Sequence, residues 1–266
     1  MVYKKLKKGT RILITGGAGF IGGYVIRRLL KESEVEIFNL DKLNYASNIE
    51  GVAELNLNSR HKLLKYDLSN SEETDKAVSI AKPDFVMHLA AESHVDRSIE
   101  KPFDFINSNI IGTFNLLESI RRYWQSMKKE RKMEFRFHHI STDEVFGSLD
   151  NSNKFTETTS YCPRSPYAAS KASSDHLINA WHHTFGIPIV TTNCSNNFGP
   201  WQFPEKLIPL VITKAMNQEE IPIYGDGKYI RDWIYVEDHV DALLLALEKG
   251  KVGKSYCIGA ECEKSN

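Results

Sequence analysis

The sequence predicts an α/β fold: a doubly wound, mostly parallel sheet with helices on both faces, followed by a small C-terminal substrate-binding lobe. Short apolar runs recur along the chain, helical or loop-like segments separate them, and a glycine-rich turn joins the first run to the first helix. Such alternation is typical of parallel strands that are buried on both faces. The expected strands are Arg11–Thr15, Val35–Leu40, Lys62–Tyr66, Asp84–Ala90, Phe135–Ser141 and Ile187–Cys194.

Two apolar helix faces accompany these strands. The first helix follows the glycine-rich turn and carries apolar residues at Val25, Ile26, Leu29 and Leu30. A later helical segment presents one broad apolar face that either packs on the sheet or, in part, pairs with a second subunit, as a homodimer through two helices per subunit would require. Its members are Phe103, Ile106, Ile110, Phe114, Leu117, Ile120 and Trp124.

Composition excludes several classes of partner. The 266 residues contain 34 Lys and Arg and 34 Asp and Glu, so no net basic charge attracts nucleic acid or an anionic membrane. No apolar run approaches the roughly 20 residues that cross a bilayer. The four cysteines form no Cys-x-x-Cys pair and the chain opens without a signal-peptide pattern, which favours a soluble protein of a reducing, cytoplasmic compartment.

The turn after the first strand reads Gly16-Gly17-Ala18-Gly19-Phe20-Ile21-Gly22. Glycines let the backbone approach a pyrophosphate, whose charge the N-terminus of the next helix favours. Asp41 follows the second strand, where a carboxylate accepts hydrogen bonds from a ribose 2′-hydroxyl and repels a 2′-phosphate, so NAD is expected rather than NADP. Lys42 beside it weakens that preference. The expected contacts of the cofactor are Gly16, Gly19, Phe20, Ile21, Gly22, Asp41, Asp67, Leu68, Ala90 and Ala91.

Catalytic chemistry is indicated by Tyr167 and Lys171, which are four residues apart and share a helix face. The ammonium is expected to lower the pKa of the phenol toward a value useful for proton transfer, beside the cofactor. Asp143 and Glu144 come directly after a strand and offer an acid and a base that simple alcohol oxidation does not need. They could instead cap a helix or face solvent. The His138-His139 and His182-His183 pairs have no companion ligands at metal spacing, so no metal is assigned.

Together these motifs resemble the extended short-chain dehydrogenase/reductase superfamily, with its Rossmann-type fold. Within it, the chain is most similar to the dTDP-glucose 4,6-dehydratase family. The segments that carry this second resemblance are 90–98, 142–145, 193–200, 203–209, 222–225 and 231–233. The resemblance implies a lyase of deoxysugar biosynthesis that acts on a nucleotide sugar with NAD bound.

The resemblance also implies a reaction path. Tyr167, assisted by Lys171 and with Thr142 polarising the hydroxyl, takes the proton from the sugar 4-hydroxyl while C4 gives a hydride to NAD. Glu144 then removes the C5 proton and Asp143 protonates the departing 6-hydroxyl. Hydride return to C6 gives dTDP-4-keto-6-deoxyglucose. The residues implied in substrate binding are Ser93, Thr142, Asn197, Lys206, Leu207, Pro222, Tyr224 and Arg231, and Asn196 is implied near the nicotinamide.

Two domains are expected: an NAD-binding Rossmann domain over residues 1–195 and a substrate lobe over 196–266, interleaved with the core. Chains of the resembling family continue beyond the point that matches Asn266, so the lobe is expected to be incomplete. The rival functions are another nucleotide-sugar enzyme of the same fold (a 4-epimerase, a decarboxylase or a dehydratase with a different nucleotide) and an idle NAD-binding interaction protein. Only a dehydratase needs Asp143 and Glu144 to remove water.

Overall fold

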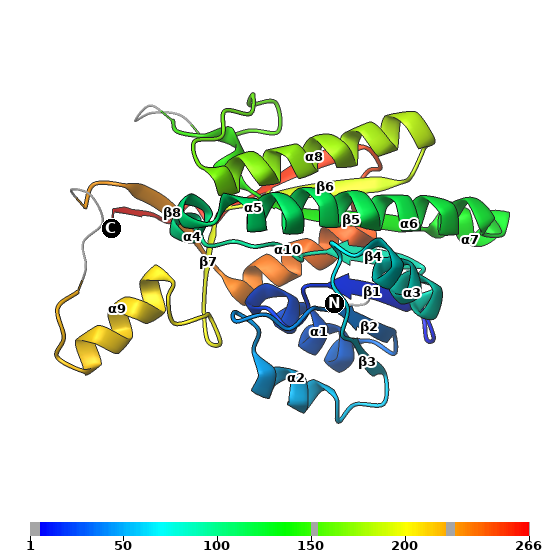
Figure 1. The fold of residues 1–266 in the computed structure, drawn as a ribbon, viewed down its shortest axis with the longest axis horizontal. Helices are drawn as coiled ribbons and strands as arrows, with labels where there is room; N and C mark the ends of the chain where they lie inside the picture. Colours follow the sequence, from blue (N-terminus) through cyan, green and yellow to red (C-terminus); the bar gives the residue numbers. More distant parts are fainter. Residues whose placement is uncertain (1–5, 150–153, 222–226, 266) are drawn as a thin grey trace.

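The computed structural model of the chain describes residues 6–149, 154–221 and 227–265. Its centre is a seven-stranded sheet in the order β3-β2-β1-β4-β5-β6-β9, with every neighbouring pair parallel (Figure 1). The predicted fold class is confirmed, and all six expected strands are present with ends shifted by at most two residues. The strands of this sheet are β1 (Arg11–Thr15), β2 (Glu36–Leu40), β3 (His61–Leu64), β4 (Phe85–His88), β5 (Arg136–Thr142), β6 (Ile189–Cys194) and β9 (Lys254–Ile258).

Helices cover both faces of the sheet because successive strand residues point to opposite sides. Ile12 and Ile14 of β1 pack with residues of α1 and α10, whereas Leu13 packs with residues of α3, α6 and α8. Figure 1 shows these helices on either side of the strands. The helices are α1 (Phe20–Glu32), α2 (Ile49–Leu55), α3 (Ser71–Ala81), α4 (Val95–Glu100), α5 (Pro102–Phe105), α6 (Gly112–Ser126), α7 (Lys129–Glu134), α8 (Pro166–Phe185), α9 (Leu207–Met216) and α10 (Val236–Lys249), with the π-helix η1 (Ile106–Ile111) and the 3-10 helix η2 (Asp143–Phe146).

The long apolar helix face is only half buried. Leu117 and Ile120 of α6 belong to the core, but Phe103, Ile106 and Phe114 are 71%, 46% and 40% exposed. The π-helix η1 interrupts the segment between α5 and α6, and exposed residues lie both before it and after it. One part of the expected apolar face therefore packs on the sheet, and the pairing of the exposed part with a second subunit stays a prediction.

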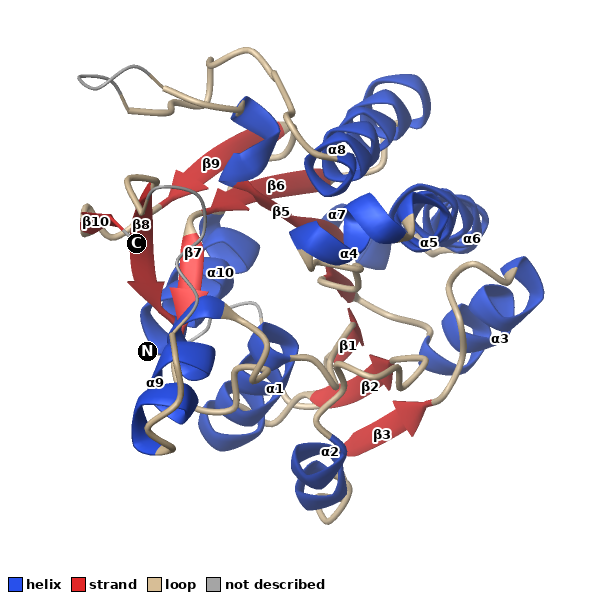
Figure 2. Cartoon of the chain, turned by 60° about the vertical axis from the view of Figure 1, so that its left-hand side comes forward, coloured by secondary structure: helices blue, strands red, loops and turns tan. Residues whose placement is uncertain are grey.

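The C-terminal part of the chain contributes to two sheets. β7 (Asn196–Phe198), β8 (Ile230–Tyr235) and β10 (Glu263–Ser265) form a small sheet in the order β10-β8-β7 (Figure 2). In contrast, α10 packs on α1, and β9 adds to the large sheet beside β6. The segment 196–266 therefore interleaves with the core, and its division from residues 1–195 as a separate lobe stays a prediction.

The order of the strands determines where a ligand can bind. From β1 the chain runs outward to β2 and β3, and it then crosses to β4 on the other side of β1. Crevices at the carboxyl ends of the strands beside such a reversal are the usual ligand sites of open parallel sheets. The turns after β1, β2, β4 and β5 all meet at this edge. Within the described residues, no helix is long and apolar enough to cross a membrane.

Candidate active site

A cavity of about 370 Å³ lies at the carboxyl edge of the sheet. Its lining comes from the ends of β1, β2, β4, β5 and β6, from α8, and from the segment between β7 and α9. The structure therefore brings most of the predicted site residues together around one space. The predicted residues that line it are Gly16, Gly19, Phe20, Ile21, Gly22, Asp41, Asp67, Leu68, Ala90, Ala91, Ser93, Thr142, Glu144, Tyr167, Lys171, Asn196, Asn197, Lys206 and Leu207.

At two positions of the glycine-rich turn a side chain would collide with neighbouring backbone. Gly16 has a φ of 73°, and a Cβ atom there would lie 2.7 Å from the Cα of Ala90. A Cβ at Gly22 would lie 2.3 Å from the main-chain oxygen of Gly16. The turn can therefore pack closely against the end of β4 and deliver the N-terminus of α1, which begins at Phe20, to the cavity. This arrangement suits a pyrophosphate.

Asp41 ties the turn after β2 to the glycine-rich turn. Its Oδ2 atom accepts a hydrogen bond from the backbone N–H of Ala18 at 3.0 Å, and its Oδ1 atom accepts one from the N–H of Leu43 at 2.8 Å. Burial raises the pKa of Asp41, and these two N–H groups oppose the rise. Oδ1 also accepts a hydrogen bond from the Ser47 hydroxyl at 3.4 Å, and Oδ2 can accept a second bond, so Asp41 can still receive a ribose hydroxyl.

Thr142, Asp143 and Glu144 lie where β5 passes into η2. The Thr142 hydroxyl accepts a hydrogen bond from the backbone N–H of Glu144 at 3.2 Å and donates one to Asp143 Oδ1 at 3.3 Å. Burial, and then the neighbouring Glu144 carboxylate, raise the pKa of Asp143 to about 7. Asp143 does not line the cavity, although Thr142 and Glu144 on either side of it do. Adjacent carboxyls thus differ in their readiness to hold a proton.

Glu144 is balanced by cations that come from the C-terminal part of the chain. Burial raises its pKa, and the positive charges of Arg231 and Lys206 oppose the rise. The exposed Arg231 guanidinium does not line the cavity, yet it acts on Asp143 as well. The structure therefore couples the two acids to two of the predicted substrate-binding cations.

Tyr167 and Lys171 lie on α8 and both line the cavity. Lys171 Nζ donates a hydrogen bond to the main-chain oxygen of Ile140 at 3.0 Å. The expectation that Lys171 lowers the pKa of Tyr167 is wrong for this structure, where burial and then the Glu144 carboxylate raise that pKa. Sequence spacing gives the helix face but not the desolvation of a buried phenol.

The residues predicted to bind the substrate make different kinds of contact in the structure. Lys206 Nζ donates a hydrogen bond to the main-chain oxygen of Ser93 at 2.8 Å, so the loop before α9 meets the loop after β4. The Asn197 amide is held internally: its Oδ1 atom accepts from His239 Nδ1 at 2.8 Å, and its Nδ2 atom donates to the Ser195 oxygen at 3.0 Å. Pro222 and Tyr224 lie outside the described residues.

Sequence reasoning missed a group of aromatic and charged residues over the mouth of the cavity. The Arg97 guanidinium lies 3.8 Å from the centre of the Tyr45 ring and 3.0 Å from a Glu205 oxygen. Tyr45 also contacts Phe203, with ring centres 5.7 Å apart. Phe203 and Glu205 lie within a segment that carries the family resemblance, but the loop 42–47 had no signal beyond its position after Asp41.

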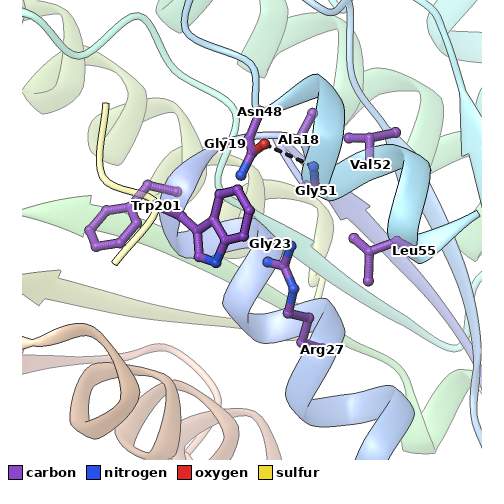
Figure 3. Close-up of a pocket in the computed structure, with 11 residues that line it drawn as sticks. Ala18, Gly19, Gly23, Arg27, Asn48, Gly51, Val52, Leu55 and Trp201 are labelled. Carbon is purple, nitrogen blue, oxygen red and sulfur yellow. Dashed lines mark hydrogen bonds between the residues drawn. The ribbon is translucent and has the colours of Figure 1, made fainter. Parts of the chain in front are cut away.

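A second, much smaller hollow of about 10 Å³ lies beside α1 under Trp201 (Figure 3). The Arg27 guanidinium lies 5.5 Å from the Trp201 ring centre, and Asn48 Oδ1 accepts a hydrogen bond from the N–H of Gly51 at 2.8 Å. This space can hold a water molecule but no nucleotide. It shows how the segment after β7 is fixed onto α1.

Comparison with known proteins places this geometry in a family. The profile of the GDP-mannose 4,6 dehydratase family matches residues 13–266. The dTDP-glucose 4,6-dehydratase of Neisseria meningitidis serogroup B is 53% identical over 257 residues, which cover 96% of this chain and 72% of the relative. That of Escherichia coli is 51% identical over 265 residues, covering 96% and 73%.

Solved structures agree with the sequence relatives. The dTDP-glucose 4,6-dehydratase of Bacillus anthracis in complex with NAD has a TM-score of 0.86 and 39% identity, and the match covers 97% of this chain and 78% of that one. The enzyme of the same name from Streptomyces venezuelae, also with NAD, has a TM-score of 0.89 and 39% identity, and the match again covers 97% of this chain and 78% of that one. The UDP-glucose 4-epimerase of Thermotoga maritima has a TM-score of 0.84 and 30% identity, and the match covers 96% of this chain and 78% of that one.

Proposed function

The chain belongs to the GDP-mannose 4,6 dehydratase family, and we propose that it is an NAD-dependent lyase that converts dTDP-glucose to dTDP-4-keto-6-deoxyglucose. The product class belongs to deoxysugar biosynthesis. The observation that carries the proposal is the pair of acids at the end of β5: Glu144 lines the cavity with Tyr167, Asp143 adjoins it without lining it, and both carboxylates act on the pKa of Tyr167. An acid whose pKa is about 7 next to a carboxylate base suits the removal of water at neutral pH.

The residues around the glycine-rich turn fit NAD. The close approach of Gly16 to Ala90 leaves backbone rather than side chain toward the cavity, and the N-terminus of α1 faces the same space. Asp41 provides carboxylate oxygens at the end of β2 for the ribose hydroxyls. When bound, NAD supplies a hydride acceptor for the oxidation and a hydride donor for the final reduction.

The first step needs a group that removes the proton of the sugar 4-hydroxyl. Tyr167 is the tyrosine of the cavity lining that lies beside Thr142 and Glu144, and the Thr142 hydroxyl next to it can orient the sugar. Burial favours the neutral phenol, so Tyr167 has to be ionised before it can accept the proton of the sugar 4-hydroxyl. The Lys171 ammonium supplies the positive charge that stabilises the developing anion.

The second step removes water from C5 and C6. The 4-ketone makes the C5 proton acidic, and Glu144 takes that proton as base, with its charge favoured by Arg231 and Lys206. Asp143, protonated below about pH 7, gives its proton to the departing 6-hydroxyl. Hydride return to C6 completes the product.

A simple assay tests this function. The purified protein is incubated with dTDP-glucose and NAD, and the ultraviolet absorbance that alkali induces in 4-keto-6-deoxy sugars is measured. We expect product with the parent chain and none with the Asp143→Asn, Glu144→Gln double variant. Conversion of UDP-glucose to its 4-epimer without absorbance would contradict the proposal and favour the epimerases that share the fold.

We also propose that the protein is a homodimer through α6 and α8. These helices pack side by side, and the surface that they form with η1 exposes Ile106 and Ile111 of η1, Phe114 of α6 and Phe185 of α8. A second copy would bury this apolar strip by pairing the same surfaces across a two-fold axis. Sedimentation should give a dimer for the parent and a monomer for Phe114→Glu, whereas a monomeric parent would contradict the proposal.

A further inference from the structure

A buried acidic residue lies one helical turn after Lys171. Asp175 follows it by four residues on α8, and its side chain is 0% exposed. Residues four apart share a helix face, so the carboxylate and the ammonium lie in the same buried layer. Burying either charge alone is unfavourable, so each needs compensation from the other or from hydrogen bonds.

The Asp175 carboxylate is surrounded by hydrogen-bond donors. Its Oδ1 atom accepts from His139 Nε2 at 2.8 Å. Its Oδ2 atom accepts from the Ser141 hydroxyl at 2.8 Å and from the Tyr161 hydroxyl at 2.9 Å. Asn193 Nδ2 donates to the same oxygen at 3.3 Å. Donors from β5, β6 and the segment before α8 therefore converge on an ionised carboxylate.

The other titratable groups that face Lys171 are neutral. Burial lowers the pKa of His139 on β5 and of His88 on β4, so neither imidazole is charged near neutral pH. Burial raises the pKa of the Cys194 thiol on β6 to about 12. Among these groups, Asp175 alone carries a negative charge, and its charge opposes the fall that burial causes in the pKa of Lys171.

Asp175 is linked to Thr142, the residue before the acid pair, through Ser141 and Asn193. Ser141, which donates to Asp175, is the neighbour of Thr142 on β5. Asn193 Nδ2 donates to the main-chain oxygen of Thr142 at 3.2 Å as well as to Asp175. The carboxylate therefore fixes the carboxyl end of β5 from which Thr142, Asp143 and Glu144 extend.

We propose that Asp175 is the buried counter-charge of the Lys171 ammonium and a positioning residue for the catalytic groups on α8 and β5. The pairing of charges is a property of the folded chain, whereas the role in catalysis rests on the proposed dehydratase function. The two parts are tested by separate measurements.

The first measurement is the titration of Lys171 by NMR, with ¹³C in the lysine ε carbons and the signal assigned from Lys171→Met. In Asp175→Asn we expect the midpoint to fall by about one pH unit or more, because the uncompensated ammonium loses its proton more readily. Ser174→Ala is the matched control. Its buried hydroxyl donates to the oxygens of Asn109 and Ser170, so the variant loses neighbouring hydrogen bonds without a change of charge. An unmoved Lys171 midpoint in Asp175→Asn overturns the proposal.

The reciprocal measurement covers the case in which Asp175→Asn does not fold. Lys171→Met retains a long apolar stem in the same space, and ¹³C in the aspartate carboxyls reports the titration of Asp175, assigned through its backbone. Coupled charges affect each other equally, so the Asp175 midpoint should rise in Lys171→Met by an amount similar to the fall expected for Lys171. The same midpoint in parent and variant contradicts the pairing.

The catalytic part is tested by the pH profile of dTDP-glucose turnover. Removal of one negative charge favours proton loss from each neighbouring group, so both limbs of the profile should move to lower pH in Asp175→Asn and stay in place in Ser174→Ala. Limbs at the parent positions overturn the positioning role. A parent without turnover on dTDP-glucose overturns the proposed function instead, and the two titrations still decide the charge pairing.

Discussion

Glu144 directly follows Asp143 at the end of β5, and its carboxylate is the largest cause, after burial, of the rise in the pKa of Asp143 to about 7. Two adjacent carboxyls in a poorly solvated place cannot both ionise easily. Arg231 and Lys206 favour the charge on Glu144. The arrangement separates the two groups into an acid and a base.

Asp143→Asn should stop the reaction after oxidation. The amide has the shape of the acid but no proton to give to the leaving hydroxyl, whereas Tyr167 still supports oxidation at C4. We expect turnover to fall by about 10² to 10⁴, while absorbance of reduced nicotinamide rises and persists in stopped-flow measurements. Release of the 4-keto-6-deoxy product at the parent rate would show that another group protonates the hydroxyl.

The pH profile of kcat should depend on the protonation of Asp143 and Glu144. In the proposed mechanism Asp143 acts when protonated, so activity should fall as the pH rises through about 7. Glu144 acts when ionised, and burial raises its pKa, so activity should also fall as the pH drops through that raised value. Removal of the positive charge in Arg231→Gln favours protonation of both acids and should move both limbs to higher pH.

Lys214→Gln is the control for this profile, because Lys214 pairs with Glu219 at 3.2 Å on the exposed end of α9. Its limbs should match those of the parent. Limbs that do not move in Arg231→Gln would mean that the guanidinium has no electrostatic influence on the acid pair.

Tyr167→Phe should suppress the first oxidation. The ring keeps its contact with Phe105, whose centre lies 6.3 Å away, so the cavity should retain its shape and bind NAD as before. We expect a loss of about 10² to 10⁴ in turnover and no transient absorbance of reduced nicotinamide. Near-parent turnover would remove Tyr167 from the proposed role, whereas weaker NAD binding would indicate a structural defect.

The sequence predicted the central strands well because each is a short apolar run buried on both faces. It did not predict β9, whose residues are mostly half-exposed at the edge of the sheet, so no strong apolar pattern marks it. The pattern of Val240, Leu243, Leu244 and Leu247 could have revealed α10. However, the proline and glycine content around it suggested a separate lobe.

The candidate site shows the same limit. Residues at strand ends could be placed from the sequence, because carboxyl ends of parallel strands meet at one edge. The Lys206 contact with Ser93 and the Arg97 contact with Tyr45 could not, because they join loops that are distant along the chain. The raised pKa of Tyr167 could not be predicted from the sequence either, because it depends on burial that only the packed structure defines.

Asp41→Ala should weaken NAD relative to NADP. The variant loses the carboxylate that would receive the ribose hydroxyls and repel a 2′-phosphate. Hydrogen bonds to a charged group are worth about 1.5–3 kcal/mol, so NAD affinity should fall roughly tenfold to a hundredfold. Because Asp41 also accepts from Ala18 and Leu43, Asp41→Asn is the milder control for loop structure. Calorimetry with both nucleotides decides, and an unchanged ratio of affinities would make Asp41 a turn residue only.

Glu92→Gln should raise the affinity for NADP. Lys42, the neighbour of Asp41, lies 3.1 Å from Glu92 Oε1, which also accepts a hydrogen bond from Asn44 Nδ2 at 2.9 Å. The backbone of Glu92 is itself anchored, since its N–H donates to Asn109 Oδ1 at 2.8 Å. In the parent this pairing compensates the ammonium beside the expected ribose position. In the variant the ammonium is free to attract a 2′-phosphate.

The ratio of NADP to NAD affinity should therefore rise about twofold to fivefold, an effect of the size measured for exposed ion pairs. The double variant Glu92→Gln, Lys42→Met should return the ratio to the parent value, because the freed ammonium is gone. Glu54→Gln is the matched control, because Glu54 pairs with Arg27 at 3.3 Å and does not line the large cavity. The ratio of NADP to NAD affinity should not change in this variant. A rise that persists in the double variant would show that Lys42 does not cause it.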